Sequence, residues 1–141
     1  MSGVAVAVSL YKANTAITNI VPATRIFAGD VAPLGTVKPY IIVMSIDGIP
    51  YSLLHSETVK QRNERVQTTI MCGGLTAATG TGYPGVKLLL RLLWPALVNQ
   101  RGTIAGFAVD GITEAGDGPD LSDISIPLYS QSTDVFVRYS S

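Results

Sequence analysis

The stretch that decides the fold consists of two runs separated by a polar insert: Tyr40-Ile-Ile-Val-Met-Ser-Ile46 and then Arg65-Val-Gln-Thr-Thr-Ile-Met71. The first run is apolar at almost every position, which predicts a central strand covered on both faces. The second run alternates and places Val66, Thr68 and Ile70 on one face. Together the two runs predict an antiparallel β-hairpin with a long tip.

The insert between these strands, residues 47–64, is about three times the length of an ordinary hairpin loop. Its inner part, residues 56–64, is polar and charged, and its outer part carries apolar and aromatic residues. Long loops of this kind are often functional, so we interpret the insert as an arm that docks on another protein. The side chains expected to make that contact are Tyr51, Leu53, Leu54, His55 and Arg62.

A helix is predicted before the hairpin, over residues 4–21. Their apolar residues fall near one helical face, Ser2 can cap the start and Pro22 stops the helix. The β-branched residues of segment 4–10 leave a strand there as the alternative. Residues 25–27, between the helix and the hairpin, can form a short strand or an anchor.

A second helix is predicted after the hairpin. Val86, Leu89, Leu90, Leu93 and Leu97 follow the i, i+3, i+4, i+7, i+11 spacing of one apolar face. The two flanking prolines fit this assignment, because one suits the first helical turn and the other, at position 95, predicts a kink or an end.

The remainder of the chain is predicted to be β-rich. Residues 104–112 are predicted to form a strand with Gly106 as a bulge or a point of close contact, and residues 114–123 are expected to be a loop. Residues 124–129, interrupted by a proline, are expected to form an edge strand or an extended arm, and residues 133–139 alternate cleanly. The whole chain, 1–141, is predicted to be one α+β domain: a mostly antiparallel β-sheet with two main helices packed on one face.

Composition limits the functional classes. Charged residues make up 14% of the 141 residues, against about 25% in ordinary soluble domains, and mean hydropathy is +0.34. We therefore expect neighbouring subunits to cover part of the surface. A formal net charge of zero argues against strong nucleic-acid binding. No membrane span is expected, since the most apolar stretch, residues 86–98, contains Lys87 and Arg91. No signal peptide is expected either, because the first residues lack a basic region and their apolar run stops by Lys12.

One motif suggests nucleotide chemistry. Residues 80–85 match GxGxxG, lie after a predicted strand and precede a helix. However, the preceding strand is expected to be antiparallel, and Pro84 removes an amide donor where a phosphate would lie. No βαβ series follows. We interpret the segment as a flexible hinge.

Other candidate sites are weaker. Cys72 and His55 could form a thiolate–imidazole pair, but they lie far apart along the hairpin and no third group is evident. Asp117, Asp120 and Asp123 are spaced unlike a calcium loop. We expect no catalytic residue, no cofactor and no metal site, and hence no enzyme.

The order of these segments resembles a known family. The segments are the N-terminal helix, Thr24-Arg25-Ile26-Phe27, Lys38-Pro39-Tyr40, the hairpin partner, a helix and a closing Ser132-Thr133-Asp134-Val135-Phe136-Val137-Arg138-Tyr139. This order is similar to that of the tail-completion, or tail-terminator, proteins of long-tailed bacteriophages, over roughly residues 5–140. The segments 73–85 and 111–123 are longer than that family leads us to expect.

The resemblance implies a structural virion protein, assembled in the bacterial cytoplasm, that forms a homo-oligomeric ring, usually of six subunits. Such a ring caps the tail tube and joins it to the neck or head-completion protein. Its partners would be other copies of itself, the tail tube protein and the neck protein. DNA would pass through the lumen without specific binding, and no membrane is involved. Another neck or tail-tube component, such as a head–tail connector, and a small nucleotide-binding module remain as alternatives.

Overall fold

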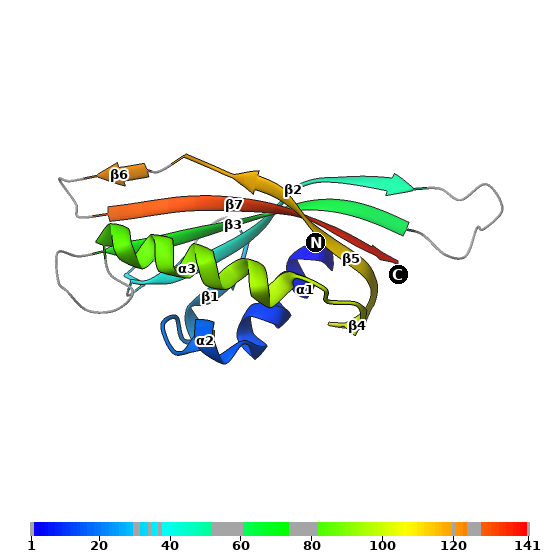
Figure 1. Ribbon diagram of the computed structural model, residues 1–141, viewed down its shortest axis with the longest axis horizontal. Coiled ribbons are helices and arrows are strands. Elements are labelled where there is room, and N and C mark those ends of the chain that lie inside the picture. Colours follow the sequence, from blue (N-terminus) through cyan, green and yellow to red (C-terminus); the bar gives the residue numbers. More distant parts are fainter. Residues whose placement is uncertain are drawn as a thin grey trace.

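The computed structural model describes residues 2–29, 32–33, 35–36, 38–51, 61–73, 82–119, 121–123 and 128–140, and for residues 2, 47–51, 61, 82, 122–123 and 128 only the backbone. Within these ranges seven strands form one sheet in the order β1-β2-β3-β7-β5-β4, with β6 pairing to β7 (Figure 1). Their bounds are β1 Ile26–Ala28, β2 Tyr40–Tyr51, β3 Gln61–Gly73, β4 Gly102–Ile104, β5 Phe107–Asp117, β6 Leu121–Asp123 and β7 Leu128–Ser140. All of these pairings are antiparallel except that of β1 with β2.

The helices lie on one face of this sheet, while one end of the sheet extends past them (Figure 1). They are α1 Ser2–Ala13, the single-turn α2 Thr15–Thr18 and α3 Gly82–Leu97, with a 3-10 turn at Ala23–Arg25. The predicted α+β class, with two main helices on one face, is confirmed. None of the described helices is long and apolar enough to cross a membrane.

The predicted helices are confirmed with two refinements. The first is split at Asn14, whose side chain accepts a hydrogen bond from the Ile17 amide at 3.1 Å and so caps a new turn. The second continues past Pro95 to Leu97. Just beyond it, Asn99 takes a left-handed φ of 61°, a conformation common where helices end.

The predicted hairpin is confirmed, but its strands are longer than expected. Tyr40 pairs with Met71, and the register runs, with a bulge between Ser45 and Asp47, to Tyr51 opposite Gln61. The prediction of an unpaired arm over residues 47–64 is therefore wrong at both ends: residues 47–51 and 61–64 are strand. β3 is paired along its whole length with β7, and its other edge provides the backbone partner of β2. The β2–β3 pairing outweighs the poor strand propensity of Gly48 and Pro50.

The C-terminal part also differs from expectation. Gly106 is not a bulge, because it forms the turn between β4 and β5 with φ of 84°. Residues 114–117, expected to be loop, continue β5 and pair with β7. The predicted edge strand 124–129 is wrong where it can be compared: Leu128 begins β7, which lies centrally between β3 and β5, and residues 124–127 lie outside the described residues. The alternation predicted for 133–139 is confirmed.

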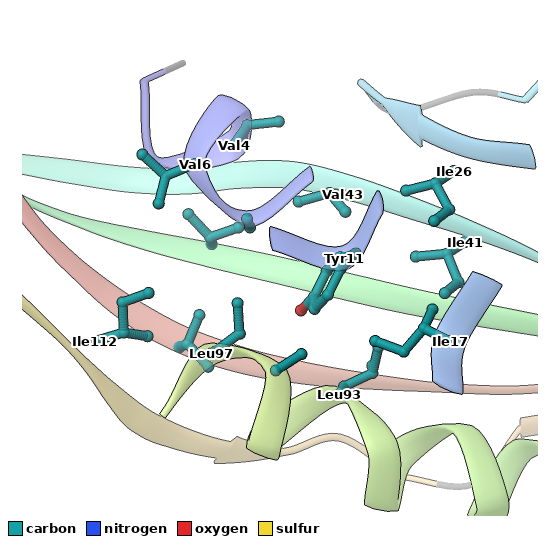
Figure 2. Close-up of a cluster of buried hydrophobic side chains, with 14 of the residues drawn as sticks. Val4, Val6, Tyr11, Ile17, Ile26, Ile41, Val43, Leu93, Leu97 and Ile112 are labelled. Carbon is teal, nitrogen blue, oxygen red and sulfur yellow. The ribbon is translucent and has the colours of Figure 1, made fainter. Parts of the chain in front are cut away.

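The core fills the space between the sheet and the helices (Figure 2). Tyr11 of α1 lies at its centre, and its hydroxyl is 2.8 Å from the Thr68 hydroxyl of β3. Burial raises the pKa of Tyr11, because the phenolate would lose its hydration. Other large, fully buried side chains come from α2, α3, β2 and β3: Ile17, Ile41, Ile70, Leu89, Leu93 and Leu97.

Candidate functional site

At the end of the sheet that extends beyond the helices, β3 lies between β2 and β7, and we call these three strands the ribbon; the outer edge of β7 pairs there with β5, up to Ser140 opposite Ala108. Gln61 pairs with Tyr51 on one side and Ser140 on the other. Of the five predicted contact residues, Tyr51 is the last residue of β2. Arg62 is exposed on β3 opposite Tyr139. Leu53, Leu54 and His55 lie outside the described residues, so their predicted contact role stays a prediction.

A buried carboxylate ties this ribbon to α1. Glu64 is 2% exposed, and the Tyr139 hydroxyl donates a hydrogen bond to its Oε1 at 3.3 Å. Its Oε2 lies so near Gly3 that a methyl group at position 3 would overlap it. The carboxylate therefore lies beside the first turn of α1, where the positive end of the helix dipole favours a negative charge. The base of the ribbon is thus held firmly, which suits an element that carries a contact surface.

The sheet face opposite the helices is polar at its centre. Arg65 donates from Nε and Nη2 to Oδ2 of Asp134, at 2.9 Å and 2.6 Å, and the hydroxyls of Thr69 and Ser132 are 3.0 Å apart. These side-chain bonds join β3 to β7 in addition to the backbone ladder. Because Asp134 neutralises Arg65, this pair contributes no net charge to the face.

A small cavity lies on the helix-covered face of the sheet, between α3 and β5. Its volume is about 90 Å³, against roughly 300–1,000 Å³ for typical small-molecule sites. Leu90, Trp94 and Val135 form part of its wall, and Glu114 and Asp117 lie at its exposed edge. Asp117 Oδ1 accepts a hydrogen bond from the Thr133 hydroxyl at 2.7 Å. The cavity can accept one side chain but not a nucleotide.

The glycine motif does not have the setting of a dinucleotide site. Residues 80–81 lie outside the described residues, α3 begins at Gly82, and β3 pairs antiparallel with both neighbours. A dinucleotide fingerprint requires a parallel strand-helix-strand unit, and the described strands that flank α3 in the sequence, β3 and β4, do not pair with each other.

The described residues bring none of the remaining candidates together. Cys72 is fully buried, and burial raises the pKa of its thiol from 9.0 to about 11, opposite to the shift that activates a nucleophile. Its imagined partner His55 lies outside the described residues. Asp117 is on β5, whereas Asp120 lies outside them and the Asp123 side chain is not described. In the described part of the chain no three potential metal ligands cluster.

Sequence reasoning misses the roles of Glu64 and Glu114. The sequence pattern places Glu64 in a polar loop, and only its position on the inward face of β3, with Val66 and Thr68, reveals its burial. Glu114 comes together with α3 because β7 lies between β3 and β5. That strand order leaves no local signal in the sequence.

The sequence matches no protein-family model and no curated protein. The structure, by contrast, matches a chain of a solved structure described as the virion of a native gene transfer agent particle. The match has a TM-score of 0.71 at 12% sequence identity, and covers 98% of this chain and 94% of the other. At that identity the match shows a shared fold.

Proposed function

We propose that this chain is a structural component of a phage-like virion, and more narrowly a tail terminator. The observation that carries the proposal is the near end-to-end structural match to a chain of a virion particle. The order of segments, which resembles the tail-completion family, supports the narrower assignment. A cavity too small for ordinary ligands and an inert buried thiol agree with a role in assembly.

In this role the chain forms a ring, usually of six subunits. The ring closes the head-proximal end of the tail tube and presents a surface to the neck protein. DNA passes through the lumen without being bound specifically. A ring needs heterologous contacts, in which two different patches of each subunit meet. The ribbon of β2, β3 and β7 supplies one such patch, because it extends beyond the helices (Figure 1).

The genetic test deletes the gene for this chain from a genome that produces the particles. Without it, we expect tail tubes of uncontrolled length and filled heads that lack tails, both visible by electron microscopy. Supply of the chain from a plasmid restores normal particles. Normal tailed particles in the absence of the chain contradict the proposal, and normal tails on detached heads favour the alternative of a head–tail connector.

The contact role of the ribbon has its own test. Tyr51 and Gln61 are register partners, so an Asn-Gly turn can join them directly and replace residues 52–60. This variant keeps every described strand and should fold with unchanged circular dichroism, yet fail to complete tails. A full-length control with Leu53→Ser and Leu54→Ser separates the apolar side chains from the length of the segment.

A further inference from the structure

The cavity between α3 and β5 combines an apolar wall with an acidic edge. The fully buried Tyr11, Leu93 and Leu97, which lie near one another in the core (Figure 2), form part of its lining, while Trp94 is only half-buried. Glu114 and Asp117 are both exposed, and their register partners, Val135 and Thr133, place them on the helix-covered face. Such a site suits a long cationic side chain, whose methylene stem packs on apolar atoms and whose charged end meets carboxylates.

Within the described part of the chain, no cation fills the site. Among the described residues, Glu114 has no ion pair, and the hydrogen bond that Asp117 accepts comes from Thr133 rather than from a cation. Asp110 adds a third exposed carboxylate farther along β5. Since the net charge is zero, the balancing positive charges lie elsewhere on the surface.

Arg62 is a matching cation two strands away from β5 and farther along β7, opposite Tyr139, whereas Glu114 and Asp117 lie opposite Val135 and Thr133. Its side chain is exposed and makes no hydrogen bond or ion pair within the described residues. Its register partner is Tyr139, so it lies on the same face as the helices but on the ribbon beyond them. In the strand order, β2 and β3 lie on one side of β7 and β5 on the other. Arg62 and the acidic cavity can therefore face two different neighbours, as a heterologous contact requires.

We propose that the cavity at Glu114 and Asp117 receives Arg62 from a second copy of this chain. The guanidinium bonds to the two carboxylates, and the stem lies against Leu90 and Trp94. The indole ring adds cation–π attraction to the contact. This contact deepens the proposed function and rests on it, because it is the subunit-to-subunit contact of the proposed ring.

Two charge reversals test the pairing. Arg62→Glu places an acid against the acidic cavity, and Glu114→Arg places an arginine against Arg62. Each variant alone should assemble only at concentrations more than about tenfold above those of the wild type, because like charges then meet in every contact. Both side chains are exposed, so both variants should keep the fold, which circular dichroism and thermal unfolding verify.

Mixing the two variants gives the sharpest readout. The glutamate introduced by Arg62→Glu then meets the arginine introduced by Glu114→Arg. At the other contact, the unchanged Arg62 of the second variant meets the unchanged Glu114 of the first. Every contact in an alternating ring is complementary, so equimolar mixing should restore assembly. Native mass spectrometry should show equal numbers of the two variants in each ring. The double variant, Arg62→Glu with Glu114→Arg, should assemble by itself.

Arg101→Glu is the matched control, since it makes the same change of charge at another exposed arginine. The neighbouring Gly102 pairs with Val109, and Val109 pairs with Tyr139, the register partner of Arg62. Arg101 therefore lies toward the same end of the sheet as Arg62 but next to β4, three strands away, and unchanged assembly of this variant shows that the effect is specific to position 62. Rings that form normally from Arg62→Glu alone overturn this contact while leaving the proposed function standing. A wild-type chain that never assembles contradicts the ring and the contact together.

Discussion

The carboxylate of Glu64 occupies the space that a side chain at position 3 would need. Gly3 lies in the first turn of α1, and a methyl group there would overlap Glu64 Oε2 and approach the Val66 side chain. Glycine is normally a poor helix residue, by about 0.5–1 kcal/mol relative to alanine. Here any larger residue would force the buried Glu64 side chain to shift.

The first prediction follows from this relationship. Gly3→Ala should lower the free energy of unfolding by about 1–3 kcal/mol, the usual cost of overpacking, although helix propensity alone predicts a gain. Urea denaturation measures the change. In a Glu64→Ala background the same substitution should cost much less, and an equal cost in both backgrounds would show that the overlap is not the cause.

The buried hydroxyl pair gives a second prediction. Tyr11→Phe leaves the Thr68 hydroxyl buried without its partner, which should cost about 1–3 kcal/mol. Adding Thr68→Val removes the orphaned group and should recover part of that loss. Chemical denaturation measures the free energy of unfolding of the two variants. A double variant that is no more stable than Tyr11→Phe would show that the unpaired Thr68 hydroxyl is not the cause of the loss.

The thiol provides a prediction about pH. Burial raises the pKa of Cys72 from 9.0 to about 11, so the folded state disfavours the thiolate. The contribution of the protonated thiol to the free energy of unfolding is fully present below the unfolded-state pKa of 9.0. It is lost as the pH rises from about 9 toward 11. At a mildly alkaline pH, below that range, the native thiol should resist iodoacetamide and should react promptly in denaturing urea. Cys72→Ala should flatten this part of the stability profile, and rapid labelling of the native protein would refute the assignment.

The ion pair on the open face should matter little. The Arg65 side chain is 40% exposed and that of Asp134 12% exposed, so solvent and salt screen the interaction. Asp134→Asn should cost no more than about 1 kcal/mol, and less in high salt. Urea denaturation at two ionic strengths measures this, and a larger loss that is insensitive to salt would indicate a role beyond this pair.

Sequence patterns predict the elements whose periodicity is local. The spacing of Leu89, Leu93 and Leu97 indicates α3, and the alternation of Val66, Thr68 and Ile70 indicates β3. Sequence patterns fail to predict strands that form only because distant segments of the chain pair with them. Residues 47–51 and 114–117 contain residues typical of loops, yet both are strand, because β3 and β7 provide backbone partners for them.

The candidate site is predictable only in part. Arg62 is among the expected contact residues, and it is exposed on the ribbon. The cavity that we pair with it could not be anticipated, because Trp94 and Glu114 meet only through the placement of β7 beside β5. Glu64 likewise looks like one more charged residue of a polar insert until its neighbours Gly3 and Tyr139 are placed.

The most direct test of the account is native mass spectrometry of the purified wild-type chain over a range of concentrations. We predict one closed species, an integral multiple of the 14.9 kDa subunit, that replaces the monomer as concentration rises. A chain that remains monomeric throughout, or that forms an open ladder of sizes without closure, contradicts the ring.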